Sequence, residues 1–339
     1  MSKKTHHILV IRLSAMGDVA MSVPVLRALT SQYPNLKVTV LTRPFFEPFF
    51  RDLDAVSIVP ADLNGVHKGV FGLYKLSKSL KKQNIDAVAD IHNVLRSKIL
   101  KAFFIGTPFI QIDKGRSEKK ALTSGAVFKQ LPTTISRYAE VFNNLGFPID
   151  LSQPTFPEPS ILSDKLQAIL GGHGTKWIGI APFAAHDSKM YPIEQMETVI
   201  ETLSKNYKVF LFGGGAKEVE ILNGFQAKYN AVINLAGQLN FNEELDIISN
   251  LDVMLSMDSG NGHMAAMLGK KVITIWGVTH PFAGFAPFNQ PDDYALTADR
   301  VKFPLIPTSI YGNKFPEGYE KASGTIAPET IVNKIISVI

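Results

Sequence analysis

The sequence of 339 residues contains no cysteine. Disulfide bonds, thiolate metal sites and cysteine nucleophiles are therefore excluded together. The sequence also lacks an apolar run of about 20 residues, the length that a helix needs to cross a bilayer. The apolar run at residues 8–11 is too short for the core of a signal peptide, and no small-residue cleavage site follows it. These absences predict a cytoplasmic protein.

The charge is modest and basic, with a formal net value of +5 at pH 7. A positive balance suits anionic partners such as phosphates or the inner face of a membrane. Alternatively, the charge only keeps the protein soluble. No nucleic-acid-binding motif accompanies it, so nucleic acid is not expected as a partner.

Apolar strand-like runs alternate with helical patterns along the chain, which predicts an α/β fold of two doubly wound, Rossmann-like domains. Four prolines, at 148, 154, 157 and 159, interrupt the alternation and mark a linker. We therefore expect an N-terminal domain at 1–155, a C-terminal domain at 160–325, and a last helix at 326–339 that packs back across either domain, with the N-terminal domain as its first candidate partner. Ligands of such sheets bind beyond the carboxyl ends of the strands, so two domains facing each other would form a cleft.

The strongest candidate site is residues 255–266, where a strand runs into small and polar residues and then into a helix rich in alanine and methionine. A helix N-terminus presents unpaired N–H groups and a positive dipole end, which suits an anion. Gly260 and Gly262 permit close approach, and Ser259 would cap the helix or donate to a phosphate. The alternative is an ordinary capped turn, with His263 in a structural role.

Three further loops follow predicted strands. The first carries Asp18, which is either a positioned general base or a first-turn acid of a helix. The second carries Lys189, which either neutralises a diphosphate or is a solvated loop lysine. The third carries Gly213-Gly214-Gly215 and Glu218. There the Glu218 carboxylate would accept a hydrogen bond from a ribose hydroxyl of a nucleotide. The loop with Asp18 lacks the three-glycine dinucleotide fingerprint, so NAD is not expected there.

Taken in order, these segments resemble glycosyltransferase family 9, the ADP-heptose heptosyltransferases of lipopolysaccharide core assembly, nearly from end to end. Residues 8–19 are similar to the family's opening strand and loop, and residues 90–97 to its segment containing Asp-Leu-Gln-Gly. Lys189-Met190-Tyr191-Pro192 resembles the motif Lys-x-Trp-Pro. Residues 257–263, Met-Asp-Ser-Gly-Asn-Gly-His, resemble the motif Asp-Thr-Gly-x-x-His.

The resemblance implies a GT-B fold and an inverting transfer of a heptose, or a similar sugar, from an ADP-sugar to an acceptor of the Kdo–lipid A type, with no cofactor and no obligatory metal. By this resemblance Asp18 is the general base. The residues implied for the donor are Lys189, Glu218, Leu239, Asp258, Ser259, Gly260 and His263. Those implied for the acceptor are Ser14, Met16, Gly17, Arg96 and Arg137.

The sequence departs from the family pattern at several positions. Phe183-Ala184-Ala185 precedes Lys189 where heptosyltransferases often carry hydroxyl residues, and Tyr191 and Ser259 replace the usual Trp and Thr. Thr133 stands where the heptosyltransferase I type has an acceptor-binding His. These changes bear on the sugar and the acceptor. Two other functions therefore stay open: a nucleotide-sugar epimerase or hydrolase of similar fold, and a non-catalytic nucleotide-sugar binding protein.

Two stretches combine aromatic and basic residues, at 43–51 and at 70–82. They suggest that the N-terminal half leans on the anionic inner face of the cytoplasmic membrane, where a lipid-linked acceptor resides. Alternatively, the aromatic residues belong to the core and the lysines form a solvated face.

Overall fold

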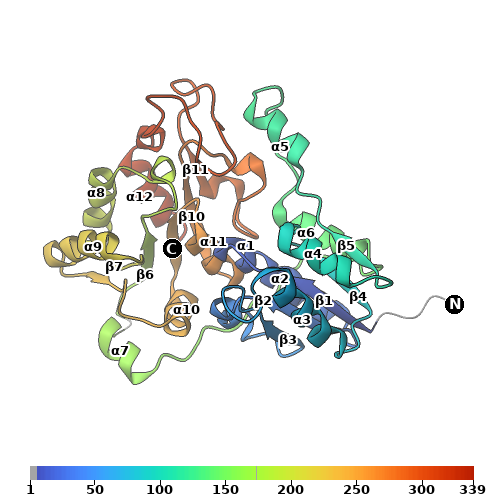
Figure 1. Ribbon diagram of the computed structural model, residues 1–339. Helices are drawn as coiled ribbons and strands as arrows, with labels where there is room; N and C mark the ends of the chain where they lie inside the picture. The colour runs from blue at the N-terminus through green and yellow to red at the C-terminus, as the bar shows by residue number, and fades with distance from the viewer. Residues whose placement is uncertain (1–5, 173) are drawn as a thin grey trace. The chain divides into compact units, whose positions relative to one another are not determined.

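The computed structural model describes residues 6–172 and 174–339. Residues 1–5, which precede the first apolar run, lie outside the described part. Contacts divide the chain into two compact units (Figure 1). Unit 1 is Met1–Lys114 with Thr134–Thr155, and unit 2 is Gly115–Thr133 with Phe156–Ile339.

Unit 1 is built on a parallel five-stranded sheet of order β3-β2-β1-β4-β5. The central strand, 7–11, is fully buried and rich in isoleucine, leucine and valine, and the strand beside it, 87–90, is fully buried as well, as strands covered on both faces are. The strands are β1 His7–Ile11, β2 Lys37–Thr42, β3 Val56–Pro60, β4 Ala87–Asp90 and β5 Phe109–Gln111. The helices are α1 Met16–Ala20, α2 Ser22–Gln32, the 3-10 helix η1 Pro44–Phe50, α3 Gly69–Lys81, α4 Leu95–Phe103 and α6 Thr134–Asn143.

Unit 2 has a parallel six-stranded sheet of order β11-β10-β9-β6-β7-β8. Its strands are β6 Trp177–Ala181, β7 Lys208–Leu211, β8 Val232–Asn234, β9 Val253–Met257, β10 Lys271–Trp276 and β11 Ala295–Thr297. Its α-helices are α5 Arg116–Thr123, α7 Asp164–Leu170, α8 Ile193–Ser204, α9 Ala216–Lys228, α10 Phe241–Asn250, α11 Gly260–Met267 and α12 Pro328–Ile336. Four short 3-10 helices complete it: η2 Asp187–Lys189, η3 Pro281–Ala283, η4 Asp292–Tyr294 and η5 Ala322–Thr325.

Both sheets reverse their strand order at the first strand of the unit. In unit 1, β1 pairs with β2 on one side and with β4 on the other. In unit 2, β6 pairs with β7 and β9 in the same manner. Because the loops on either side of such a point leave in opposite directions, a crevice opens at the carboxyl ends of the two central strands. The predicted α/β class with two Rossmann-like sheets is therefore confirmed.

The observed boundaries differ from the expected ones in the first half of the chain. Residues 115–133, expected in the N-terminal domain, belong to unit 2. There Leu122 and Leu131 form a small apolar cluster with Ala283, with Phe282 and Phe285 packed against it. The backbone N–H of Leu131 also donates to the carbonyl of Phe282 at 2.9 Å. Burial of these side chains explains why the segment leaves the unit that surrounds it in the sequence.

The last helix also differs from the expectation that it packs on the N-terminal domain. Helix α12 packs against α8, and its side chains Ile331, Val332 and Ile335 are part of the core of unit 2. Its apolar positions recur at helical spacing and need an apolar partner, which α8 provides. Among the residues that the structure describes, no helix has the length and apolar character to span a membrane.

Candidate functional site

Asp18 lies in the third position of α1, directly beyond the carboxyl end of β1. Its carboxylate is 2.5 Å from the Nη2 atom of Arg12 and accepts a hydrogen bond from the Ala15 N–H at 3.3 Å. The Tyr138 hydroxyl donates to the backbone carbonyl of Asp18 at 3.2 Å. The side chain nevertheless remains 29% exposed. The structure thus fixes the carboxylate in one orientation and leaves part of it open to a ligand.

The loop after β4 lies on the other side of the same switch point. Asp90 is fully buried and accepts hydrogen bonds from the N–H groups of His92 and Asn93 and from the Gln111 amide. The Nη1 atom of Arg12 donates to the carbonyl of Ile91 at 2.8 Å. The loop after β1 is therefore tied to the loop after β4, and the geometry of each depends on the other.

His92 also connects these two loops. Its Nδ1 atom accepts the N–H of Leu13 at 3.4 Å, and its Nε2 atom lies 3.5 Å from the hydroxyl of Ser14. Burial first, and then the charges of Arg12, Lys114, Arg43 and Arg96, together lower the pKa of His92 to about 3. The ring is therefore neutral at pH 7. Because Nδ1 accepts, the proton resides on Nε2, facing Ser14.

The charges that act on His92 form a basic region at this edge of unit 1. Arg96, predicted for the acceptor, is exposed at the start of α4. Arg137 on α6 donates to the carbonyl of Asp113 at 3.4 Å and is only 10% exposed. Arg43 and Lys114 were not predicted as site residues. Arg43 directly follows β2, so its position at the carboxyl edge was readable from the sequence.

We expect the neutral state of His92 to make stability fall with acid. Its pKa in the folded protein, about 3, is below the unfolded value of 6.5, so the unfolded chain binds the extra proton between these two pH values. Folding is then fully favoured above pH 6.5 and loses stability as the pH falls through this window. Compared with the wild type, His92→Gln should lose about 2 kcal/mol less of its unfolding free energy between pH 7 and pH 5.

Urea denaturation at the two pH values measures this difference. His186→Gln is the matched control, because it makes the same replacement at a histidine that is exposed in the loop after β6. An acid sensitivity that is equal in His92→Gln and the wild type would contradict the assignment.

In unit 2, Lys189 and Asp258 meet across the second switch point. Lys189 ends η2 in the loop after β6, and Asp258 follows β9 directly. The Lys189 ammonium is 2.8 Å from Oδ2 of Asp258, and the two side chains are only 14% and 9% exposed. The Thr279 hydroxyl donates to the same carboxylate oxygen at 2.9 Å. Thr279 was not predicted, although it follows β10 at the same edge of the sheet.

The stem of Lys189 is fixed by Gly312. A Cβ at Gly312 would lie 2.6 Å from Cγ of Lys189, and the residue has a φ of +80°. The hydroxyl of Ser188 donates to the carbonyl of Gly312 at 2.5 Å. Only glycine fits both the backbone conformation and the close approach of the lysine.

Helix α11 begins where the sequence predicted an anion site, but its capping differs. Ser259 occupies the N-cap position without a side-chain capping bond. Ser256, the fourth residue of β9, accepts the N–H of Gly262 at 3.1 Å, and its hydroxyl lies 3.0 Å from that of Ser259. His263 is buried in the helix. The cap therefore comes from the strand, and the expected capping role of Ser259 is corrected.

The loops after β7 and β8 supply the remaining predicted donor residues. Glu218, in the first turn of α9, accepts the N–H of Gly214 at 2.7 Å and so closes over its own glycine turn. Leu239 is half-buried and directly precedes Asn240, the N-cap of α10. The structure thus brings the predicted donor residues to one edge of one sheet, on the loops of four strands.

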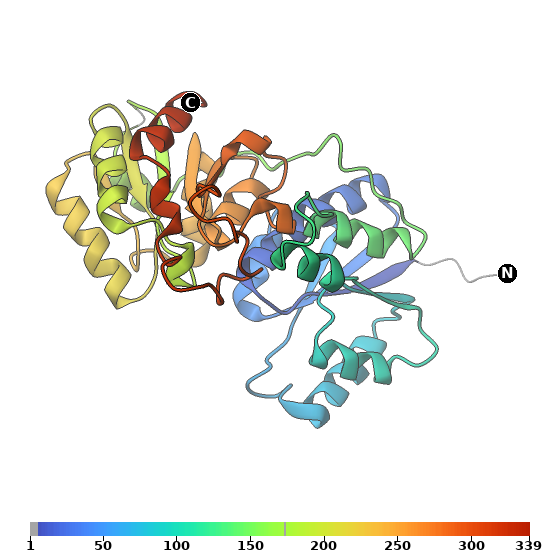
Figure 2. The same ribbon diagram turned by 90° about the horizontal axis from the view of Figure 1, so that it is seen from above.

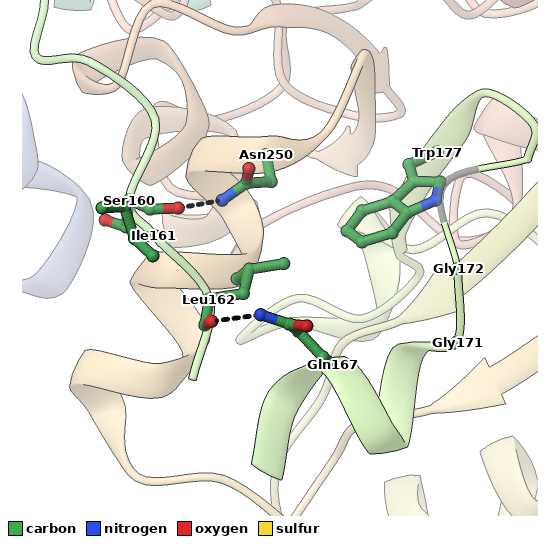
Figure 3. A pocket seen from close by; sticks show the side chains of 8 residues that line it. All are labelled: Ser160, Ile161, Leu162, Gln167, Gly171, Gly172, Trp177 and Asn250. Carbon is green, nitrogen blue, oxygen red and sulfur yellow. Dashed lines mark hydrogen bonds between the residues drawn. The ribbon is translucent and has the colours of Figure 1, made fainter. Parts of the chain in front are cut away.

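A separate hollow lies at the opposite end of this sheet (Figure 3). Its lining includes Trp177, the first residue of β6, and the chain before α7. Asn250 donates to the carbonyl of Ser160 at 2.9 Å, and Gln167 donates to that of Leu162 at 2.8 Å (Figure 3). The Asn250 amide thus holds the segment before α7 against the end of α10. Within residues 6–172 and 174–339, no group of three or more histidine or acidic side chains is placed to hold a metal ion.

Comparison with known proteins gives the family. The model described as glycosyltransferase family 9 (heptosyltransferase) matches residues 73–297. The chain belongs to glycosyltransferase family 9. Lipooligosaccharide heptosyltransferase 2 of Haemophilus influenzae is 30% identical over 352 residues, which cover 97% of this chain and 98% of that protein. This family 9 member is accordingly a glycosyltransferase, as the sequence motifs indicated.

Solved structures show the same fold. The family 9 glycosyltransferase of Veillonella parvula superposes with a TM-score of 0.77 at 17% identity, covering 100% of this chain and 98% of that one. The ADP-heptose lipopolysaccharide heptosyltransferase II of E. coli gives 0.69 at 21% identity and 98% coverage of both chains. The GT-B fold predicted for this family 9 chain is confirmed.

Proposed function

We propose that this glycosyltransferase is an inverting heptosyltransferase that moves a heptose from ADP-heptose to a lipopolysaccharide inner-core acceptor of the Kdo–lipid A type. The observation that carries the proposal is the buried Lys189–Asp258–Thr279 cluster beside the start of α11. The names of the relatives from H. influenzae and E. coli, both heptosyltransferases, support the choice of sugar, and the E. coli name supports ADP-heptose.

The donor diphosphate would bind at this cluster. A lysine ammonium has three donor hydrogens, so its bond to Asp258 leaves others for a phosphate. The positive end of the α11 dipole, at Ser259 and Gly260, adds to the attraction. Phe183 and Ala184 pack against the core of unit 2 and offer no hydroxyl, so the phosphates depend on Lys189 and α11.

The other donor contacts follow from their loops. Asp258 would contact the sugar, with His263 nearby on α11. Glu218 would accept from a ribose hydroxyl, and Leu239 would lie against the adenine. Because Glu218 already orders the Gly214 turn, a ribose hydroxyl would meet a carboxylate held in place.

Asp18 would act as the general base at unit 1. The acceptor hydroxyl gives its proton to the Asp18 carboxylate while its oxygen forms a bond to the anomeric carbon. The bond from that carbon to the diphosphate breaks, and ADP leaves with the electron pair. A single displacement from the opposite face inverts the configuration. Lys189 and the positive end of the α11 dipole stabilise the negative charge that develops on ADP and so lower the free energy of the transition state.

The acceptor would be a lipid-linked, anionic glycan at the inner face of the cytoplasmic membrane. Its carboxylates or phosphates fit the basic region around His92, to which we assign Arg43 and Lys114 together with Arg96. Arg137 and the loop residues Ser14, Met16 and Gly17 would contact the same acceptor. No cofactor or metal is part of this proposal, since cationic side chains and a helix dipole oppose the developing charge.

Release of ADP from ADP-heptose, followed with and without a Kdo–lipid A acceptor, tests the function. We expect release only when the acceptor is present, and stronger inhibition by added ADP than by GDP or UDP. Release without acceptor would favour the epimerase or hydrolase. Nucleotide binding without release under either condition would favour a non-catalytic binding protein, and equal inhibition by the three nucleotides would refute the adenine donor.

A further inference from the structure

Helix α3 in unit 1 has an outer face that folding leaves uncovered. Its inner side chains Leu73, Leu76 and Leu80 pack in the core of the unit. On the outer side, Phe71 is 86% exposed, Val70 54% and Tyr74 43%. Burying a side chain of this size is worth roughly 1.5–3 kcal/mol, so exposed neighbours of this kind point to a partner.

The loop before α3, residues 62–68, packs on the helix and fixes the exposed apolar residues in place. Gly72 lacks a side chain where a Cβ would lie 2.3 Å from the backbone of His67, so the preceding loop packs directly on α3. The Asp62 carboxylate accepts the N–H groups of Gly65 and Val66 in that loop. Val66 is 69% exposed on it. The apolar end of the surface is therefore fixed in place.

The charge of this surface has one sign. Residues 63–85 contain no aspartate or glutamate, and their lysines are Lys68, Lys75, Lys78, Lys81 and Lys82. All five are exposed. No ion pair among the described residues involves them. The Lys78 ammonium instead lies 4.7 Å from the centre of the Tyr74 ring.

Helix α4 packs beside α3 and extends the basic character (Figure 2). The rings of Tyr74 and Phe103 connect the two helices at 5.4 Å between centroids. Residues 91–112, which include α4, also lack acidic residues and carry Arg96, Lys98 and Lys101. The earlier stretch at 43–51 differs, because Phe46, Phe49 and Phe50 are buried in the core. Of that stretch Phe45 alone among the phenylalanines is exposed, so the α3 part is the larger portion of the expected aromatic and basic surface that is available to a partner.

We propose that the outer face of α3, Val70, Phe71 and Tyr74 with Lys75, Lys78, Lys81 and Lys82, binds an anionic lipid bilayer. The apolar first turns enter the interface, and the lysines contact anionic headgroups. A bilayer fits better than nucleic acid, because aliphatic side chains such as Val66 and Val70 offer bases no stacking surface. This surface deepens the proposed function, since it would bring unit 1 to a lipid-linked acceptor.

Co-sedimentation of the full chain with vesicles, without donor or acceptor, tests the surface. Phosphatidylethanolamine–phosphatidylglycerol vesicles should bind the protein, with an affinity that falls with salt, and neutral phosphatidylcholine vesicles should bind it far less. Replacing Lys75, Lys78, Lys81 and Lys82 by glutamine should weaken binding roughly fivefold for each lysine. Phe71→Ser should weaken it roughly tenfold.

Matched controls lie in unit 2. Lys129, Lys302, Lys314 and Lys321 are exposed, and their replacement by glutamine removes the same charge. Ile161, which is 96% exposed, is the counterpart of Phe71. Both control variants should bind the vesicles like the wild type. Equal loss in test and control variants, binding indifferent to anionic lipid, or binding of single-stranded DNA through these lysines without vesicle binding would overturn the proposal.

The outcome is separate from that of the proposed function. All variants should release ADP from ADP-heptose with a deacylated, water-soluble acceptor at the wild-type rate. Vesicle binding without any transferase activity would retain the surface and reject the reaction. Transferase activity with no vesicle binding would retain the proposed reaction and reject the membrane-binding surface.

Discussion

Asp18→Asn is expected to lower acceptor-dependent turnover by roughly 10²–10⁴-fold, the range for loss of a general base. The asparagine keeps the shape of the side chain and can still accept from the Ala15 N–H, so the loop after β1 should remain in place. The amide no longer takes the proton of an acceptor hydroxyl. Steady-state ADP release gives the loss in turnover, and isothermal titration with ADP should give unchanged affinity.

The ion pair with Arg12 makes a stability control necessary. The Arg12 side chain is only 6% exposed, and the variant leaves its charge without the carboxylate. We therefore expect a lower free energy of unfolding as well, by about 1–3 kcal/mol. Asp54→Asn, an exposed acid of unit 1, should change neither property. Wild-type turnover in a folded Asp18→Asn protein would contradict the assignment of Asp18 as the general base.

Lys189→Met is expected to lower kcat by roughly 10²–10³-fold, as loss of a preorganised donor at a developing charge does. Methionine keeps an aliphatic stem against Gly312 but has no ammonium for the diphosphate. It also leaves the Asp258 carboxylate, only 9% exposed, with Thr279 as its hydrogen-bond donor. A buried charge without its ionic partner should cost about 3 kcal/mol of unfolding free energy. Turnover assays and urea denaturation measure the two effects.

A second substitution separates these two effects. In Lys189→Met with Asp258→Asn, the buried charge is gone, so stability should recover while turnover remains low. Lys176→Met is the matched control. Its ammonium is also 2.8 Å from a carboxylate, that of Asp252, but is 56% exposed, so its loss should alter stability little. Activity restored together with stability in the double variant would assign Lys189 a structural role only.

Much of the fold could be predicted because its signals are local. The buried strands β6 and β9, for example, are short apolar runs of the kind that predicts an alternation of strands and helices. The helix after Asp258 was less well predicted, since Gly260 and Gly262 suggest a loop, yet both lie in α11. There, the Ser256 hydroxyl and packing against β9 and β10 outweigh the low helix propensity of glycine.

The site was predictable where a residue directly follows a strand. Lys189 and Asp258 were each identified as candidate site residues, because each follows a strand and parallel strands end at one edge of their sheet. Their contact was not predictable, since it requires β6 and β9 to be neighbours although 71 residues or more separate them in the chain. The role of Gly312 was missed for the same reason: no local pattern connects a distant glycine with the stem of a lysine.

Residues 115–133 belong to unit 2 although both flanking segments belong to unit 1, and this affects how the chain can be divided into fragments. The polypeptide passes from one unit to the other at three places, near residues 115, 134 and 156, so unit 2 is discontinuous in sequence. A fragment that starts at 156 would lack Leu122 and Leu131 and would expose Ala283 with its neighbouring phenylalanines. During synthesis, likewise, α5 leaves the ribosome before the surface that it covers has been made. Autonomous halves of this enzyme would therefore need residues 115–133 joined to the fragment that starts at 156, and residues 134–155 joined to 1–114, because a single cut at the proline-rich linker separates neither unit.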